Sequence, residues 1–239
     1  MSFLTKNYKI SIVSFICLLI TSCGDYGDYR NYYKSNDFLL KPSKVKSINI
    51  AQLIFNLIES DKNLVPKLTY SGDGKIIYKY KKNLYEKELS LEQIEKRIKI
   101  GYKFYEKERK DIVKLLQKIN DLGISNKLDV IESGALGLWI PGRNQIIINR
   151  KVVSMGSKIF LDVLSHEAIH ISQSCFNGSK NSFPKKIGLP LEYSKEIDLN
   201  LSHNVYTKNS EIILDIEREA FSYSKKDGIA IKLLNNFCY

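Results

Sequence analysis

The sequence predicts an α+β fold. Several segments carry apolar residues at the three- and four-residue spacing of an amphipathic helix, and short apolar runs between turn motifs are typical of strands. Of the 239 residues, 44% are hydrophobic and 26% are charged, which is typical of a globular protein and excludes a polytopic membrane protein. No internal repeat divides residues 48–239, so we expect a single domain there.

The N-terminus resembles the signal peptide of a bacterial lipoprotein. Lys6 and Lys9 precede an apolar run from Ile10 to Ile20, which is shorter than a membrane-spanning helix. The run ends in Leu19-Ile20-Thr21-Ser22-Cys23, and this order is similar to a lipobox. The resemblance implies that residues 1–22 are removed and that Cys23 carries lipid, which would anchor the protein to a membrane outside the cytoplasm. An ordinary secretory signal and an uncleaved anchor are the alternatives.

Residues 23–47 are rich in Tyr, Asp, Gly, Ser and Lys without a hydrophobic period, and we interpret them as a flexible tether. The formal net charge of the whole chain is +11, which favours attraction to anionic headgroups. The lysines are scattered rather than clustered, so we expect no nucleic-acid partner.

The first elements of the expected domain are a helix over 48–59 and a strand over 75–80 that follows a turn at 71–74. A second, weaker strand is expected over 83–89. The sequence Ser90-Leu91-Glu92-Gln93 is a capping box, and the apolar spacing after it predicts one long amphipathic helix that ends at Gly123.

The later segments predict a strand over 137–140, a turn over 141–144 and a strand over 145–149. A helix over 157–176 follows, and Gly178 lies just past its end. Residues 181–204 contain two prolines and are expected to be an irregular connection. We expect a helix over 210–226, a break at Asp227-Gly228, and a last short helix that reaches Phe237.

The motif HExxH lies within the helix expected at 157–176, as His166-Glu167-Ala168-Ile169-His170. Two histidines four residues apart are about 40° apart around a helix, so both rings can reach one metal ion. Glu167 is close enough in azimuth to contact a water molecule on that metal and take its proton. The alternative is a metal-free helix in which both histidines are satisfied by hydrogen bonds.

A catalytic zinc site needs a third protein ligand. A third histidine six residues after His170 would fall at Phe176, so the metzincin pattern is excluded. His203 lies in the segment expected to be irregular. The other candidates are Glu217 and Glu219, on the helix expected at 210–226.

The chain resembles gluzincin-type zincin metallopeptidases. The resemblance covers HExxH and a downstream ExxA, here Glu217 and Ala220, and Gln173 also fits some members. It implies that His166, His170 and Glu217 bind zinc and that Glu167 is the general base, with Glu219 as the rival ligand. It also implies a zincin-like domain over 48–239, in which the strand at 145–149 lies at the sheet edge and pairs with an extended peptide substrate.

Four further residues complete the expectations. Trp139 and Tyr223 are possible pocket residues, but packing roles are the simpler interpretation. Cys175 and Cys238 remain after processing, and a disulfide between them would contribute about 4 kcal/mol on the chain-entropy model. The alternative is two free thiols.

These observations predict a membrane-anchored zinc hydrolase that cleaves peptide bonds in a peptide or protein substrate. One alternative is a non-enzymatic surface lipoprotein that keeps the fold and the zinc as a binding module. A second alternative is a zinc hydrolase that acts on cell-wall or other amide bonds.

Overall fold

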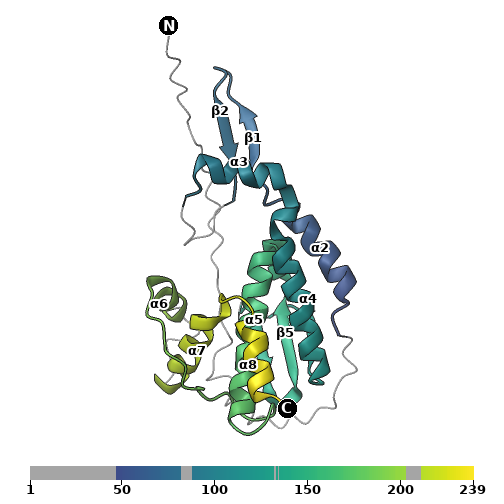
Figure 1. Ribbon diagram of the computed structural model, residues 1–239, viewed down its shortest axis with the longest axis vertical. Coiled ribbons are helices and arrows are strands. Elements are labelled where there is room, and N and C mark those ends of the chain that lie inside the picture. The colour runs from purple at the N-terminus through teal and green to yellow at the C-terminus, as the bar shows by residue number, and fades with distance from the viewer. Residues whose placement is uncertain (1–46, 82–87, 132, 134, 203–210) are drawn as a thin grey trace.

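Helix α5 (Ser157–Phe176) is the central element of the protein, which has the α+β composition that the sequence predicts (Figure 1). The computed structural model describes residues 47–81, 88–131, 133, 135–202 and 211–239. The expected signal peptide, Cys23, the expected tether up to residue 46, and His203 lie outside these residues. Among the described residues, no helix combines the length and the apolar character needed to cross a bilayer.

A three-stranded sheet covers one side of α5. Its strands are β3 (Ser125–Asp129), β4 (Gly137–Ile140) and β5 (Gln145–Asn149), in the order β3-β5-β4. Strand β5 runs parallel to β3 and antiparallel to β4. The short 3-10 helix η3 (Pro141–Arg143) connects β4 to β5. A second 3-10 helix, η4 (Arg150–Met155), leads from β5 into α5.

The expectation that the strand at 145–149 lies at the sheet edge is wrong. Strand β3, which the sequence did not predict, pairs with β5 from Ser125↔Gln145 to Asp129↔Asn149 and occupies the side that would have been open. The residues of β3 are mostly polar, so the strand has no apolar alternation to reveal it. Strand β4 is therefore the antiparallel edge strand.

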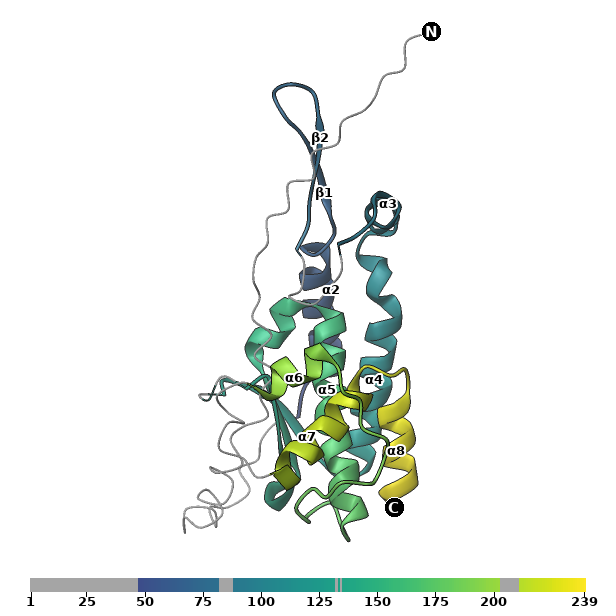
Figure 2. The same ribbon diagram turned by 90° about the vertical axis from the view of Figure 1, so that its left-hand side faces the viewer.

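Helices α2 (Ile50–Lys62), α4 (Glu106–Asp121) and α8 (Ile229–Phe237) pack around the other sides of α5 and share its main core (Figure 2). Helix α7 (Glu211–Ser224) crosses α5, and the short helix α6 (Lys195–Leu201) packs on α7. Helix α6 falls in the connection expected to be irregular, where Ser194 caps its first turn through a bond from Ile197 N.

The single long helix expected after Ser90 is two helices. Helix α3 (Leu91–Ile100) begins with the predicted capping box, but it ends at Gly101, which has φ +63°. The 3-10 helix η2 (Gly101–Tyr105) then leads into α4. The break allows Ile94 of α3 to pack in a separate small cluster, while α4 packs in the main core.

The small cluster supports an arm that projects from the body of the protein (Figures 1 and 2). Its hairpin consists of β1 (Lys67–Tyr70) and β2 (Ile76–Lys79), so the expected strand at 75–80 is confirmed, but its partner precedes the turn. The weaker strand expected at 83–89 falls mostly outside the described residues, and 88–89 are not in a strand.

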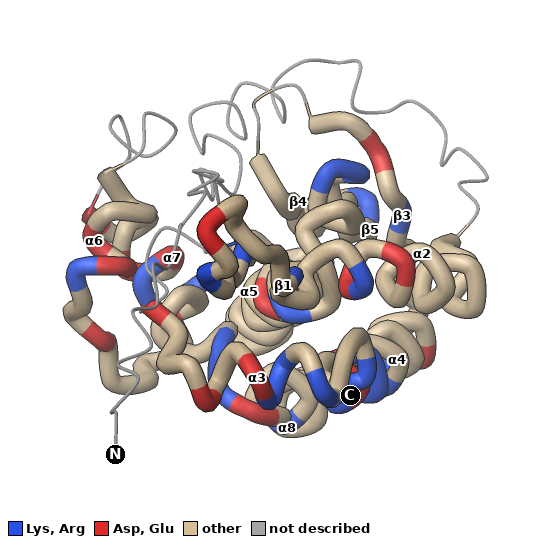
Figure 3. The backbone as a smooth tube through the Cα atoms, turned by 90° about the horizontal axis from the view of Figure 1, so that it is seen from above, with Lys and Arg blue, Asp and Glu red and all other residues tan. Residues whose placement is uncertain are grey.

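Charged residues of both signs lie along α3 and α4 (Figure 3), in agreement with the scattered lysines of the sequence. One acidic residue has a structural role in the interior. The buried carboxylate of Asp61 on α2 accepts hydrogen bonds from Ser157 N (2.8 Å) and Ser157 Oγ (2.6 Å) and pairs with the Arg109 guanidinium of α4. Asp61 therefore caps the first turn of α5 and joins three helices.

A disulfide joins the end of α5 to the C-terminal residues. The Cys175 and Cys238 sulfurs are 2.06 Å apart, so the structure contains the predicted bridge rather than two free thiols. Phe176 and Phe237 pack edge to face beside it, with ring centroids 5.5 Å apart. Helix α8 is thereby held against the C-terminal half of α5.

Candidate metal centre

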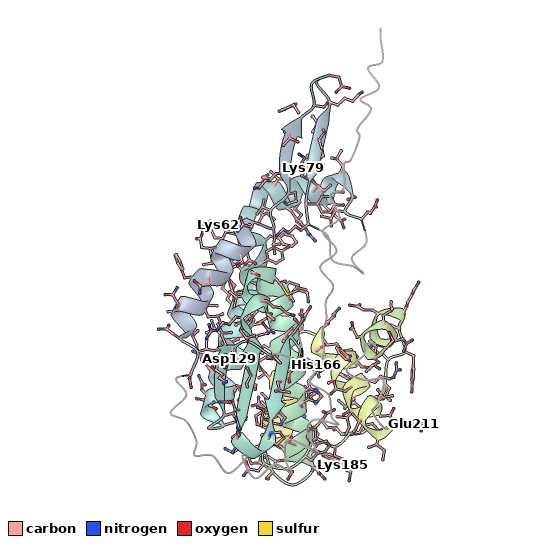
Figure 4. The ribbon with its side chains drawn as sticks, turned by 180° about the vertical axis from the view of Figure 1, so that it is seen from behind. Lys62, Lys79, Asp129, His166, Lys185 and Glu211 are labelled. Atoms are coloured by element: carbon pink, nitrogen blue, oxygen red, sulfur yellow. A yellow bond between two sulfur atoms is a disulfide. The ribbon has the colours of Figure 1, made fainter. Side chains whose placement is uncertain are left out.

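The HExxH residues lie in the middle of α5, where the helix is buried on all sides. His166, Glu167 and His170 expose 5%, 1% and 2% of their surface. Figure 4 shows His166 between the sheet, where Asp129 is labelled, and helix α7, which begins at Glu211. Buried imidazoles and carboxylates need polar partners, so this part of the core must satisfy them internally.

Three side-chain atoms from α5 and α7 form a small triangle. His166 Nε2 and His170 Nε2 are 3.1 Å apart, and Glu217 Oε2 lies 3.2 Å from the first and 3.4 Å from the second. In a tetrahedral zinc site with bonds of about 2.0–2.1 Å, neighbouring ligand atoms are about 3.3 Å apart. The three residues could therefore hold a metal ion with the spacing that zinc requires.

Helix α7 brings Glu217, rather than Glu219, to the histidines. The Glu217 carboxylate is fully buried beside both rings, whereas the Glu219 carboxylate is turned to Gln173 and to the backbone of residues 187–189. Ala220, one turn after Glu217, is also fully buried in the core between the helices. The small side chain permits the close approach of α7 to α5 that places Glu217 at the site.

Phe221 packs against His166, the first of the three candidate ligands. Its ring packs on the His166 ring with centroids 4.3 Å apart, from a position one turn after Glu217 on α7. No pattern in the sequence singles out Phe221, because an aromatic residue on a helix is usually a core residue.

Opposite charges stabilise one another inside the metal-free site. Burial by itself lowers the pKa of His170, but the charge of Glu217 and the hydrogen bond with it outweigh burial and raise the pKa to about 9. For Glu217, burial opposes ionisation, yet the two imidazoles hold the pKa of the carboxyl well below its usual range. The metal-free site therefore binds a proton on His170 at neutral pH.

Zinc binding at neutral pH should release this proton, because a histidine must be deprotonated to bind a metal. The apparent zinc affinity should rise about tenfold per pH unit between about pH 6 and pH 8 and become constant above the pKa of His170, near 9. Calorimetry in buffers of different ionisation enthalpy counts the released protons. An affinity that does not change over this range would contradict the assignment of His170 as a ligand.

The carboxylate of Glu167 lies against the backbone of the edge strand. A methyl group placed on Gly137 of β4 would be 2.8 Å from both Cγ and Cδ of Glu167, closer than real carbon atoms approach. The negative charge of Glu167 also contributes to the raised pKa of His170. Gly137 was not identified from the sequence, although a glycine within a strand is a signal of close backbone approach.

Replacing Gly137 with alanine should displace the Glu167 carboxylate, and it should therefore reduce the hydrolysis that the sequence predicts without removing the predicted zinc ligands. The expected loss is about 10- to 100-fold, less than complete removal of a general base. Gly72→Ala is the matched control, because a methyl group there meets no atom within 4 Å and the residue has an ordinary φ. Equal activity of the two variants, measured as kcat at equal zinc content, would show that contact with Gly137 does not position Glu167.

The remaining candidate residues have packing roles. Trp139 is buried and donates a hydrogen bond from Nε1 to Ser174 Oγ (2.9 Å), which ties β4 to α5. Tyr223 donates from its hydroxyl to Pro190 O (3.0 Å). Both observations agree with the simpler interpretation of these residues, and neither side chain is part of the triangle.

No protein-family model matches the chain, and neither a curated protein nor a solved structure does. The function of the protein is therefore inferred from the chemistry of the site.

Proposed function

We propose that this protein is a zinc-dependent hydrolase of peptide bonds. The observation that carries the proposal is the triangle of His166, His170 and Glu217 atoms with separations of 3.1–3.4 Å, and Glu167 follows His166 directly on α5. Three protein ligands are typical of a catalytic zinc, which keeps a fourth position for water or substrate. A structural zinc usually has four protein ligands and needs no adjacent base.

A zinc ion held by these residues would act as a Lewis acid toward water and toward the scissile carbonyl group. Glu167 accepts the proton of the attacking water and later donates it to the amine that leaves. Its carboxylate is held against Gly137, so it is oriented before substrate arrives. Phe221 and Gln173 contact the two imidazoles and limit their rotation.

The edge strand β4 is the best candidate to bind the substrate. It replaces the strand at 145–149 in this role, because β5 is paired on both sides. An extended peptide that adds to β4 would form main-chain hydrogen bonds close to Gly137, and its scissile bond would then lie near Glu167.

The location outside the cytoplasm is part of the proposal. The lipobox-like sequence ending at Cys23 supports a lipid anchor, and the Cys175–Cys238 disulfide is typical of an oxidising compartment. Replacing Cys23 with serine should leave the precursor uncleaved and without acyl label, as seen by gel mobility and labelling with a fatty acid analogue. A variant that is still processed and labelled would contradict the anchor.

Metal analysis and a cleavage screen test the main proposal. The purified protein should contain about one zinc per chain and should cleave members of a broad library of peptides and unfolded proteins. A protein that binds zinc and cleaves nothing would favour the alternative of a binding module, because the ligand triangle alone would explain its metal content. A protein that binds no zinc would refute the proposal.

A further inference from the structure

The Glu219 carboxylate is buried in a complete set of hydrogen-bond donors. Its Oε1 atom accepts from Gly188 N (2.9 Å) and Leu189 N (2.8 Å), and its Oε2 atom accepts from Ile187 N (2.8 Å) and Gln173 Nε2 (2.9 Å). Each oxygen therefore accepts two bonds, and all four partners are donors. A side chain that only accepts hydrogen bonds suits this position, whereas an amide would place its own donors against other donors.

These bonds determine how the Gln173 side chain is oriented. Its Nε2 atom lies near two acceptors, Glu219 Oε2 and Ile216 O (3.0 Å), so the NH₂ end of the amide must face them. The Oε1 atom then faces His170 Nδ1 at 2.7 Å. Because Gln173 Oε1 can only accept, His170 Nδ1 must carry the proton of this bond.

The position of this proton affects the metal site. A histidine with its proton fixed at Nδ1 offers the Nε2 lone pair to a metal, and His170 Nε2 is the atom in the ligand triangle. We propose that Glu219 is a positioning residue, which acts through Gln173 to hold the ring and the tautomer of His170 for zinc. Because the zinc is itself part of the proposed function, this inference rests on it.

The same carboxylate holds the segment between α5 and α7. Residues 187–189 are bound to Glu219 through three consecutive backbone N–H groups. The connecting segment and the metal ligand His170 are therefore held by one carboxylate. The alternative is that Glu219 has only a structural role. Its replacement would then release residues 187–189 without any effect on His170.

The test compares three variants of the full-length protein. Glu219→Gln keeps the shape but leaves two of the four donors without an acceptor. Gln173→Met keeps the side-chain length and leaves the backbone bonds of Glu219 in place, so it tests the link even where Glu219→Gln does not fold. Asp61→Asn is the matched control. Asp61 of α2 is also a fully buried carboxylate with several donors, but its carboxylate binds Ser157 at the first turn of α5.

The first measurement is the ring N–H proton of His170 in the ¹⁵N-histidine-labelled protein, which contains three histidines. In wild type and in Asp61→Asn, we expect a slowly exchanging, downfield Nδ1–H resonance with and without zinc. Both Gln173→Met and Glu219→Gln should lose or broaden it. The second measurement is zinc affinity by competition with a chelator, which should fall about 10- to 100-fold in these two variants, as is typical when a partner of a metal ligand is lost.

Two outcomes would overturn the inference. One is a Glu219→Gln protein that is destabilised like Asp61→Asn but keeps the His170 resonance and the zinc affinity of wild type. The other is a Gln173→Met protein with an unchanged resonance. The resonance is measured in the metal-free protein as well, so a failure of the proposed function, seen as a wild type without zinc or without cleavage, is distinguishable from a failure of this inference.

Discussion

Replacing Glu217 with alanine should nearly abolish zinc binding. The change removes the ligand that α7 supplies and leaves His166 and His170 with their Nε2 atoms 3.1 Å apart and without the carboxylate that contacts both of them. Two imidazoles alone do not complete a catalytic zinc site. We expect the zinc affinity to fall by more than about 100-fold. A loss of up to about 100-fold is typical when only a hydrogen-bond partner of a ligand is removed.

Zinc affinity of the Glu217→Ala protein is measured by chelator competition, with Glu211→Ala as the control. Glu211 begins the same helix and is exposed, so its removal should leave the affinity unchanged. Circular dichroism and thermal unfolding of both variants would show whether α7 remains folded. Unchanged zinc binding by a folded Glu217→Ala protein would mean that another residue is the third ligand.

Replacing Glu167 with glutamine should leave zinc bound and remove most of the cleavage. The amide has the shape of the carboxylate and keeps all three proposed ligands, but it cannot accept the proton of the attacking water. Loss of a general base lowers the rate by about 10²- to 10⁴-fold. The effect should appear in kcat, because the carboxylate acts in the chemical step rather than in binding the substrate.

The control for Glu167→Gln is Asp162→Asn, which also neutralises a carboxylate on α5. Asp162 forms an ion pair with Lys158 and is partly exposed. Its rate should remain close to that of wild type. A Glu167→Gln protein that cleaves as fast as wild type would show that Glu167 is not the base. Zinc retained with the rate lost would separate the hydrolase from a binding module, which has no use for a base.

Much of this protein follows from local sequence patterns. The period of apolar residues predicted α2, α5, α7 and α8 nearly at their observed bounds, because a helix that packs against a core must place apolar residues at that spacing. The turn at 141–144 and its flanking strands were predicted for a similar reason, since a hairpin needs its turn residues next to its strands. The HExxH spacing likewise determines that two imidazoles and a carboxylate lie on neighbouring faces of one helix, because that geometry is internal to α5.

Other features depend on contacts between distant segments, which no local pattern records. The polar strand β3 is a strand because β5 offers it a free edge, and this pairing makes β3 and β4, rather than β5, the edge strands. The break at Gly101 allows α3 and α4 to bury their apolar faces in two different clusters.

The candidate metal site shows most clearly which features follow from local sequence and which depend on tertiary packing. Sequence alone determined that α5 carries His166, Glu167 and His170, and it left Glu217 and Glu219 as rivals two residues apart on one helix. Only the packing of α7 on α5 decided between their roles, because residues two apart on a helix point about 200° apart and so face different neighbours. Glu217 meets the two histidines, and Glu219 meets Gln173 and the backbone of 187–189. The contact of Gly137 with Glu167 was decided in the same way, by the distance between a strand and a helix that the chain brings together only when it folds.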